Sequence, residues 1–112
     1  MLKKNLFIPL LLLSLPTLIH AKDVWIIVHG TFARKIADVA PKARWWRPED
    51  TFFKTLKTNV KKSASVHAFE WSGSNLHDKR VKAGKELAEF IPTVAQATDE
   101  IHIVAHSHGA NV

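Results

Sequence analysis

The hydrophobic pattern after residue 21 predicts three strands separated by two helices. An unbroken apolar run occurs at 24–28, and it is typical of a strand buried on both faces of a sheet. Segments rich in β-branched or aromatic residues at 66–71 and 101–104 are expected as the second and third strands, and Glu100 opens the last of them. The intervening segments are long enough for crossover connections. We therefore expect an α/β fold, a parallel sheet with helices on both faces and right-handed crossovers.

The first crossover is expected to contain a long loop over 33–47, with a short helical piece at 33–39, and then a helix over 48–62. Pro48 suits the first helical position, and Glu49 and Asp50 suit the first turn, where the helix dipole favours negative charge. The apolar face of this helix consists of Phe52, Phe53, Leu56 and Val60.

The second crossover is expected to hold a longer helix that ends near Thr98-Asp99. Asn75 is the candidate N-cap, Asp78 lies in the first turn, and Pro92 is a candidate kink. A spacing of three and four residues defines one buried stripe, formed by Val81, Gly84, Leu87, Ala88, Ile91 and Val94.

Residues 1–21 have the pattern of a secretory signal peptide rather than of the domain. Lys3 and Lys4 precede an apolar run over 6–19, which ends at the small residue Ala21. The run is shorter than the ~20 apolar residues that a spanning helix needs. We expect cleavage, a mature domain over 22–112, export to the periplasm or medium, and no stable membrane anchor.

Composition narrows the function further. Loss of the signal segment removes two lysines and no acid, so the formal charge falls from +6 to +4. The basic residues alternate with acidic ones at helical spacing, which is typical of solvated helix faces, so no nucleic-acid partner is expected. The chain has no cysteine, which excludes a disulfide and a lipoprotein anchor. No glycine-rich phosphate loop is present, and we expect no cofactor.

The segment Ala105-His106-Ser107-His108-Gly109 carries the candidate chemistry. It follows the third predicted strand, and small residues flank the serine at the two positions that a sharp strand-to-helix turn requires. The usual nucleophile elbow is Gly-x-Ser-x-Gly, and Ala105 keeps the small side chain with less backbone freedom. Ser107 is therefore the candidate nucleophile.

The segment His29-Gly30-Thr31 follows the first predicted strand and supplies a second part of such a site. Attack of a serine on a carbonyl creates an oxyanion, which needs donors placed in advance about 3 Å away. The backbone N–H groups of Thr31 and His108 are the candidate donors, with the Thr31 hydroxyl as an extra one. In a parallel sheet the ends of both strands open into one crevice.

These two motifs together resemble the α/β-hydrolase superfamily, and within it the lipase- and esterase-like serine hydrolases. His29-Gly30-Thr31 resembles the family's oxyanion His-Gly-x segment, and 105–109 resembles its elbow. The resemblance covers roughly 24–112. It implies an α/β-hydrolase-like fold, Ser107 as nucleophile, an oxyanion hole from Thr31 and His108, and a small-molecule or lipid ester as substrate.

The sequence departs from the family after the elbow. In the superfamily the acid and the histidine of the triad follow the serine, but the chain ends at Val112, so we expect a domain truncated after the nucleophile elbow. His67 and His77 are expected at the surface rather than in catalysis. A serine without a base is a poor nucleophile, so this chain is expected to be nearly inactive. The alternative is a non-catalytic remnant of a hydrolase gene.

Two further alternatives concern the residues around the predicted crevice. His106 and His108 could share a zinc ion in a metal-dependent hydrolase, but Ala110 and Asn111 stand where further ligands are required, so no metal is expected. The aromatic residues of the crevice region either line an acyl pocket or anchor their loops on the domain, and the anchoring role is favoured. These residues are Phe32, Trp45 and Trp46, while Trp71 is expected in the core or crevice wall.

Overall fold

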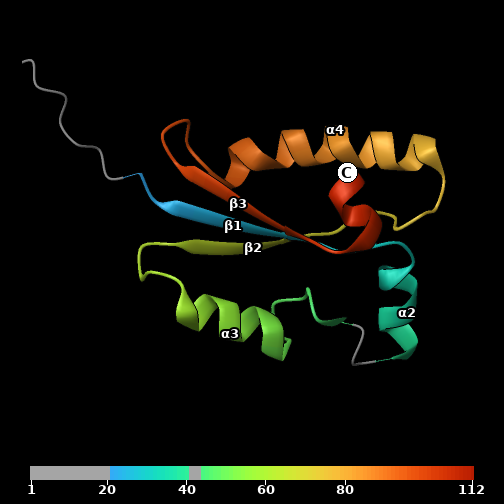
Figure 1. Ribbon diagram of the computed structural model, residues 1–112, viewed down its shortest axis with the longest axis horizontal. Helices are drawn as coiled ribbons and strands as arrows, with labels where there is room; N and C mark the ends of the chain where they lie inside the picture. The colour runs from blue at the N-terminus through green and yellow to red at the C-terminus, as the bar shows by residue number, and fades with distance from the viewer. Residues whose placement is uncertain (1–20, 41–43) are drawn as a thin grey trace, which may run out of the picture.

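The computed structural model describes residues 21–40 and 44–112. These residues contain three strands and three α-helices, and helices connect each strand to the next. The elements are β1 (Asp23–Val28), α2 (Ala33–Val39), α3 (Thr51–Asn59), β2 (Ser65–Phe69), α4 (His77–Val94), β3 (Glu100–Ala105) and a short 3₁₀ helix, η2 (Ser107–Asn111) (Figure 1). Except for residue 21, the predicted signal peptide lies outside the described residues.

The strands form one parallel sheet in the order β2-β1-β3. β1 is central, so both of its edges are hydrogen-bonded, and Val24, Ile26, Ile27 and Val28 are completely buried. This burial explains why β1 reads as an unbroken apolar run. The α/β class, the parallel sheet and the order of elements along the chain are confirmed.

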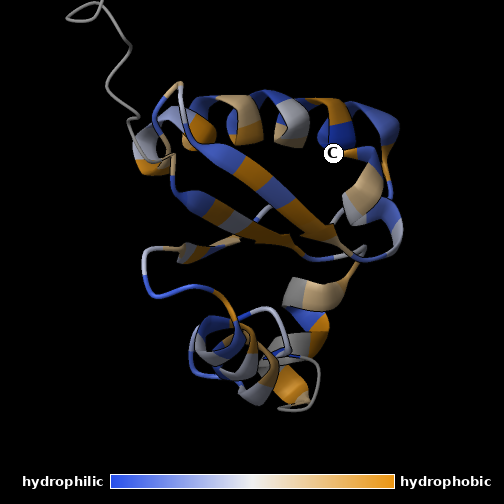
Figure 2. Ribbon diagram, turned by 60° about the vertical axis from the view of Figure 1, so that its left-hand side comes forward, coloured by the Kyte–Doolittle hydropathy of each residue, from blue (hydrophilic) through white to orange (hydrophobic). Residues whose placement is uncertain are grey.

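Side chains of β1 alternate between two apolar clusters. Val24, Ile26 and Val28 pack with Ala83 and Leu87 of α4, whereas Ile27 packs with Trp46 and with Phe53 of α3. In Figure 2 the middle of the sheet is mostly hydrophobic, whereas hydrophilic and hydrophobic residues alternate along the helices. The central strand is therefore packed on both faces, and the loop that follows it begins from this buried position.

The first predicted boundary that the structure corrects is the start of α3. The helix runs over 51–59 rather than 48–62, and Asp50 is its N-cap rather than part of its first turn. The Asp50 carboxylate accepts the backbone N–H of Phe52 at 3.2 Å, which satisfies one of the free donors at the helix start. Of the predicted apolar face, Phe53 is buried and Phe52 is largely exposed.

The boundaries of α4 also differ from those predicted. Leu76, not Asn75, is the N-cap, and it provides no side-chain hydrogen bond; Asp78 does lie in the first turn. The helix ends at Val94, two residues after Pro92, because the backbone turns to an extended conformation at Ala95. Ala83 and Leu87 are the buried positions, whereas Val81 of the predicted stripe is exposed.

His67 of β2 is less exposed than predicted. Its ring lies edge-on to Phe90, and its Nε2 atom is buried with no hydrogen-bond partner among the described residues. Desolvation of the charged ring lowers the pKa of His67, and the positive charge of Lys22 lowers it further. His67 is thus partly buried and packs on Phe90, instead of being fully exposed. His77 is exposed, as expected.

Candidate functional site

The candidate site lies where the two neighbouring strands β1 and β3 end. From β1 the chain passes toward α2 and α3, whereas from β3 it passes into η2, and Val112 beyond it packs on the cluster that contains α4 (Figure 1). The chain thus leaves the ends of adjacent strands toward opposite faces of the sheet. In parallel sheets such a point is the usual ligand site.

Ser107 occupies a strained backbone position at this point. Its φ angle is 54°, in the left-handed region, and it begins η2 directly after the extended residue His106. A non-glycine residue in this region costs on the order of 1 kcal/mol or more. The strand-to-helix turn predicted at Ser107 is therefore present. The turn is sharp, and Ser107 lies at its apex.

Glycines on both sides of the turn allow the backbones to approach closely. A Cβ atom added to Gly30 would lie 3.0 Å from the Ser107 Cβ and 2.9 Å from the His106 carbonyl oxygen. A Cβ added to Gly109 would lie 2.6 Å from the carbonyl oxygen of His29. The two predicted motifs, 77 residues apart in sequence, therefore pack directly against each other.

Thr31 and His108 also come together, as the sequence led us to expect. The Thr31 Oγ1 atom lies 2.7 Å from the His108 Nδ1 atom, and the imidazole tautomer decides which of the two donates. Within the part of the chain that the structure describes, neither residue's backbone N–H donates a hydrogen bond. For His108 this follows from its place at the start of a helix, where N–H groups have no partner inside the helix.

His29 is buried and holds the strand end in place. Its Nε2 accepts the Trp71 backbone N–H at 3.1 Å, so the proton is on Nδ1, which donates to the Gly30 carbonyl oxygen at 2.9 Å. The Trp71 indole N–H in turn donates to the His29 carbonyl oxygen at 2.7 Å. His29 therefore supports the site through the backbone around Gly30.

Sequence reasoning missed the contribution of Gly73. This glycine has a φ angle of 66°, and its carbonyl oxygen accepts the Phe32 backbone N–H at 2.7 Å. Phe32 itself has a φ angle of 59°. The bond ties the loop after β2 to the loop after β1, next to Thr31. The glycine in Ser72-Gly73-Ser74 indicated a turn in the sequence, but the sequence could not show that this turn contacts the loop after β1.

The aromatic residues near the crevice have different roles. Trp46 is completely buried, with its ring 4.7 Å from that of His29, so it anchors its loop as favoured from the sequence. Trp71 is also buried, its ring stacks with that of His29 at 5.7 Å, and it belongs to the core cluster, as expected. Trp45 lies edge-on to Phe52 at 5.3 Å and to His106 at 5.8 Å, and Phe32 is half exposed.

A general base for Ser107 is not provided by the described residues. No ion pair or hydrogen bond within the described ranges joins His106 or His108 to a carboxylate, and the His108 Nδ1 is occupied by Thr31. The described histidines at the elbow also form no group of three metal ligands. A cavity of about 320 Å³ lies at the end of β2, lined by residues that include Glu70, Ser72 and Lys82, but not by Ser107.

The fold and the turn together define a small parallel α/β domain with a serine at the end of an edge strand. No family model, curated protein or solved structure matches the chain. Among the described residues, no helix has both the length and the apolar character needed to cross a membrane.

Proposed function

We propose that this chain carries the nucleophile and the oxyanion hole of an exported serine hydrolase that cleaves carboxylic esters, as lipases and esterases do. One observation carries the proposal: Ser107 sits at a left-handed strand-to-helix turn, packed against Gly30 at the end of the neighbouring parallel strand. The proposal includes an α/β-hydrolase-like arrangement, with α3 and α4 covering opposite faces of the sheet.

In the proposed reaction the Ser107 Oγ attacks the carbonyl carbon of the ester, and the carbonyl oxygen becomes an oxyanion. The backbone N–H groups of Thr31 and His108 stabilise this charge. Collapse of the intermediate breaks the bond to the alcohol, which leaves with a proton, and an acyl-serine remains. Attack by water on the acyl-serine then releases the acid and restores the Ser107 hydroxyl.

The proton of Ser107 needs an acceptor, and within the described ranges no histidine paired with a carboxylate lies beside the serine. We therefore propose that these 112 residues react slowly by themselves. An oxyanion hole without a complete triad retains about 10³–10⁴-fold catalysis over water in a related knockout series. A non-catalytic remnant of a hydrolase gene is the alternative, and the following measurement separates the two.

A fluorophosphonate probe tests the site directly. We expect a covalent adduct on Ser107 of the folded protein, formed over hours and identified by mass spectrometry of the peptide that contains it. Labelling is expected to disappear in Ser107→Ala and in urea-unfolded protein, because only the folded turn aligns the serine with its N–H donors.

Ser72→Ala and Ser74→Ala are the matched controls, since both serines lie in the neighbouring loop after β2. They should leave the labelling rate unchanged. Equal labelling of folded and unfolded protein, or of Ser107→Ala, would favour the non-catalytic alternative. Complete labelling within minutes would contradict the slow reaction and indicate a full triad.

We also propose that residues 1–21 direct export to the periplasm or medium and are removed. A short apolar run behind two lysines favours this role over that of an anchor. When the complete chain is expressed in a bacterium, the exported protein should have the intact mass of residues 22–112. Lys3→Glu with Lys4→Glu should retain the uncut chain in the cytoplasm. Recovery of the uncut chain from the membrane fraction would contradict cleavage.

A further inference from the structure

A second polar cluster lies at the opposite end of the sheet from Ser107. Where β1 and β3 begin, Asp23 is in register with Glu100, and Trp25 is in register with His102. Residues two apart on a strand share a face, so these four side chains project from one face of the sheet. It is the face of Ile27 and Val104, which pack with Phe53 of α3.

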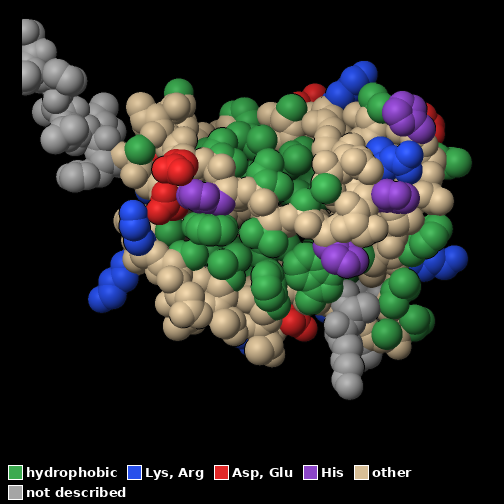
Figure 3. Space-filling view, in the orientation of Figure 1, with side chains coloured by type: hydrophobic (Ala, Val, Ile, Leu, Met, Phe, Trp, Pro, Cys, Tyr) green, Lys and Arg blue, Asp and Glu red, His purple; other side chains and the backbone are tan. Residues whose placement is uncertain are grey.

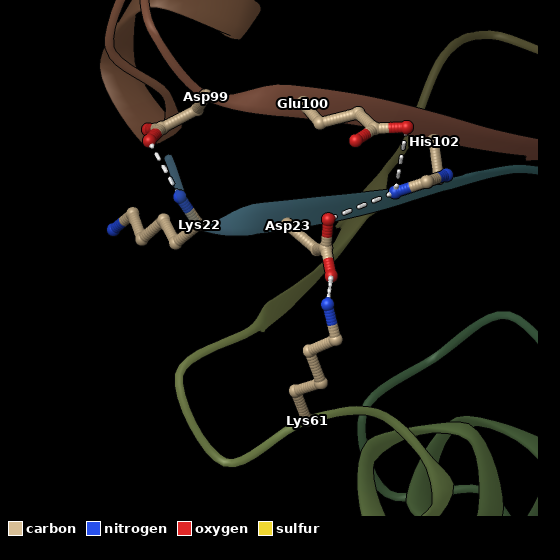
Figure 4. A network of polar contacts seen from close by, with 6 residues as sticks. All are labelled: Lys22, Asp23, Lys61, Asp99, Glu100 and His102. Carbon is tan, nitrogen blue, oxygen red and sulfur yellow. Dashed lines mark hydrogen bonds and ion pairs between the residues drawn. The ribbon is translucent and has the colours of Figure 1, made fainter. Parts of the chain in front are cut away.

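Three of these residues bring their ligand atoms close together, with the carboxylates of Asp23 and Glu100 both directed at the His102 ring nitrogen (Figure 4). The His102 Nε2 lies 3.3 Å from the Asp23 Oδ1 and 3.9 Å from the Glu100 Oε1. All three ligand atoms lie within 4.8 Å of one another. Tetrahedral ligands at zinc, with bonds of about 2.0–2.2 Å, are separated by roughly 3.4 Å, so a small movement of Glu100 would complete the geometry.

Two members of the cluster, His102 and Asp23, are already held in orientation by their neighbours. The His102 ring stacks on Trp25 at 4.3 Å with an angle of 16° between the planes, which directs Nε2 toward the carboxylates. The hydrogen bond from His102 holds the pKa of Asp23 below its usual value, and Lys61 lowers it further, although burial opposes both. The Glu100 side chain is 72% exposed and free to adjust.

We propose that Asp23, Glu100 and His102 form a binding site for a divalent zinc ion that joins the starts of β1 and β3. An imidazole with two carboxylates suits zinc, whereas calcium and magnesium prefer ligand sets made of oxygen alone. Three protein ligands leave the fourth position to water. The site is open to solvent, since a histidine and acidic side chains are visible together at this end of the molecule in Figure 3.

Lys61 competes with the ion for Asp23. Its Nζ lies 3.6 Å from the Asp23 Oδ2, and the lysine side chain is 80% exposed. The carboxylate faces Lys61 with one oxygen and His102 with the other (Figure 4). At 3.6 Å, with the lysine largely in solvent, the pair contributes little free energy, so zinc is expected to displace the ammonium group into solvent.

Isothermal titration of tag-free protein with zinc chloride tests the proposal, with urea unfolding followed in the presence and absence of zinc. We expect one equivalent to bind and to stabilise the fold. Glu100→Gln and His102→Gln should each weaken binding by about tenfold or more, since even changes behind the ligands cost 10–100-fold. Lys61→Met should tighten it about two- to fivefold, as expected when a competing exposed ion pair is removed.

His77→Gln is the matched control for loss of an exposed histidine, and His106→Gln tests a site at the elbow. Both should bind zinc as the unchanged protein does. If His102→Gln does not fold, the other two variants still test the proposal, because Glu100→Gln should weaken zinc binding and Lys61→Met should tighten it. No zinc binding up to millimolar concentration, or binding that none of the three cluster substitutions alters, would overturn the proposal.

Discussion

Replacement of His29 by alanine is expected to lower the free energy of unfolding by about 3 kcal/mol or more. The ring is completely buried, and its Nε2 accepts the backbone N–H of Trp71. Loss of the ring leaves that donor unpaired, at about 1–3 kcal/mol, and opens a cavity beside the rings of Trp46 and Trp71, which both contact it. Urea unfolding followed by tryptophan fluorescence measures the change.

His29→Gln separates the role of the hydrogen bond from that of the ring. A glutamine amide oxygen can reach the Trp71 N–H in place of Nε2, so this variant should recover part of the lost stability. His77→Ala, at an exposed position, should change stability by no more than about 0.5 kcal/mol. If His29→Ala were as mild as this control, His29 would not hold the strand end, and the segment proposed to form the oxyanion hole would need another support.

The strands could be predicted because burial imposes a local pattern on them. β1 has neighbours on both edges and apolar clusters on both faces, so each position from Val24 onward is restricted to apolar residues. The same reasoning is weaker for β3, where Ile101 and Ile103 are partly exposed at the edge of the described sheet. There the apolar residues of 101–104 and the turn motif that follows them at Ser107 together predicted the strand.

Helix boundaries were predicted less well, because single side chains decide them. Pro48, Glu49 and Asp50 are all acceptable in a first turn. The helix starts at Thr51 because the Asp50 carboxylate reaches the Phe52 N–H. At α4 the reverse occurs: Asn75 has the preferred cap chemistry, yet its side-chain oxygen faces Arg80 at 3.5 Å instead of a helix N–H. The capping preferences of single residues therefore locate the start of a helix to within a few positions, but they do not identify the N-cap residue.

The parts of the candidate site could be named from sequence, but their contacts could not. Gly30 and Ser107 each stand in a recognisable local motif, while the packing between them depends on which strands are neighbours in the sheet. Gly73 and Trp71 had no motif, although both hold the loop after β1. The cluster at Asp23 was missed for the same reason, since its ligands come from two strands far apart in sequence.

Gly109→Ala is expected to be the second most damaging substitution. A Cβ atom at this position would lie 2.6 Å from the His29 carbonyl oxygen and 2.8 Å from that of Val28. Both oxygens belong to the backbone at the end of the buried central strand, which cannot move aside as a flexible side chain would. The helix η2 must shift instead, and overpacking of this kind costs about 1–3 kcal/mol.

The shift should also disturb Ser107, which begins the same short helix. We therefore expect Gly109→Ala to lower the melting temperature by roughly 5–20 °C, from the 4–8 °C that 1 kcal/mol produces in a domain of this size, and to slow fluorophosphonate labelling of the protein that remains folded. Ala110→Ser is the matched control, because its side chain is exposed in the same helix, and it should alter neither. Unchanged stability in Gly109→Ala would mean that η2 does not pack on β1 as closely as described, and the position of Ser107 beside Gly30 would lose its main support.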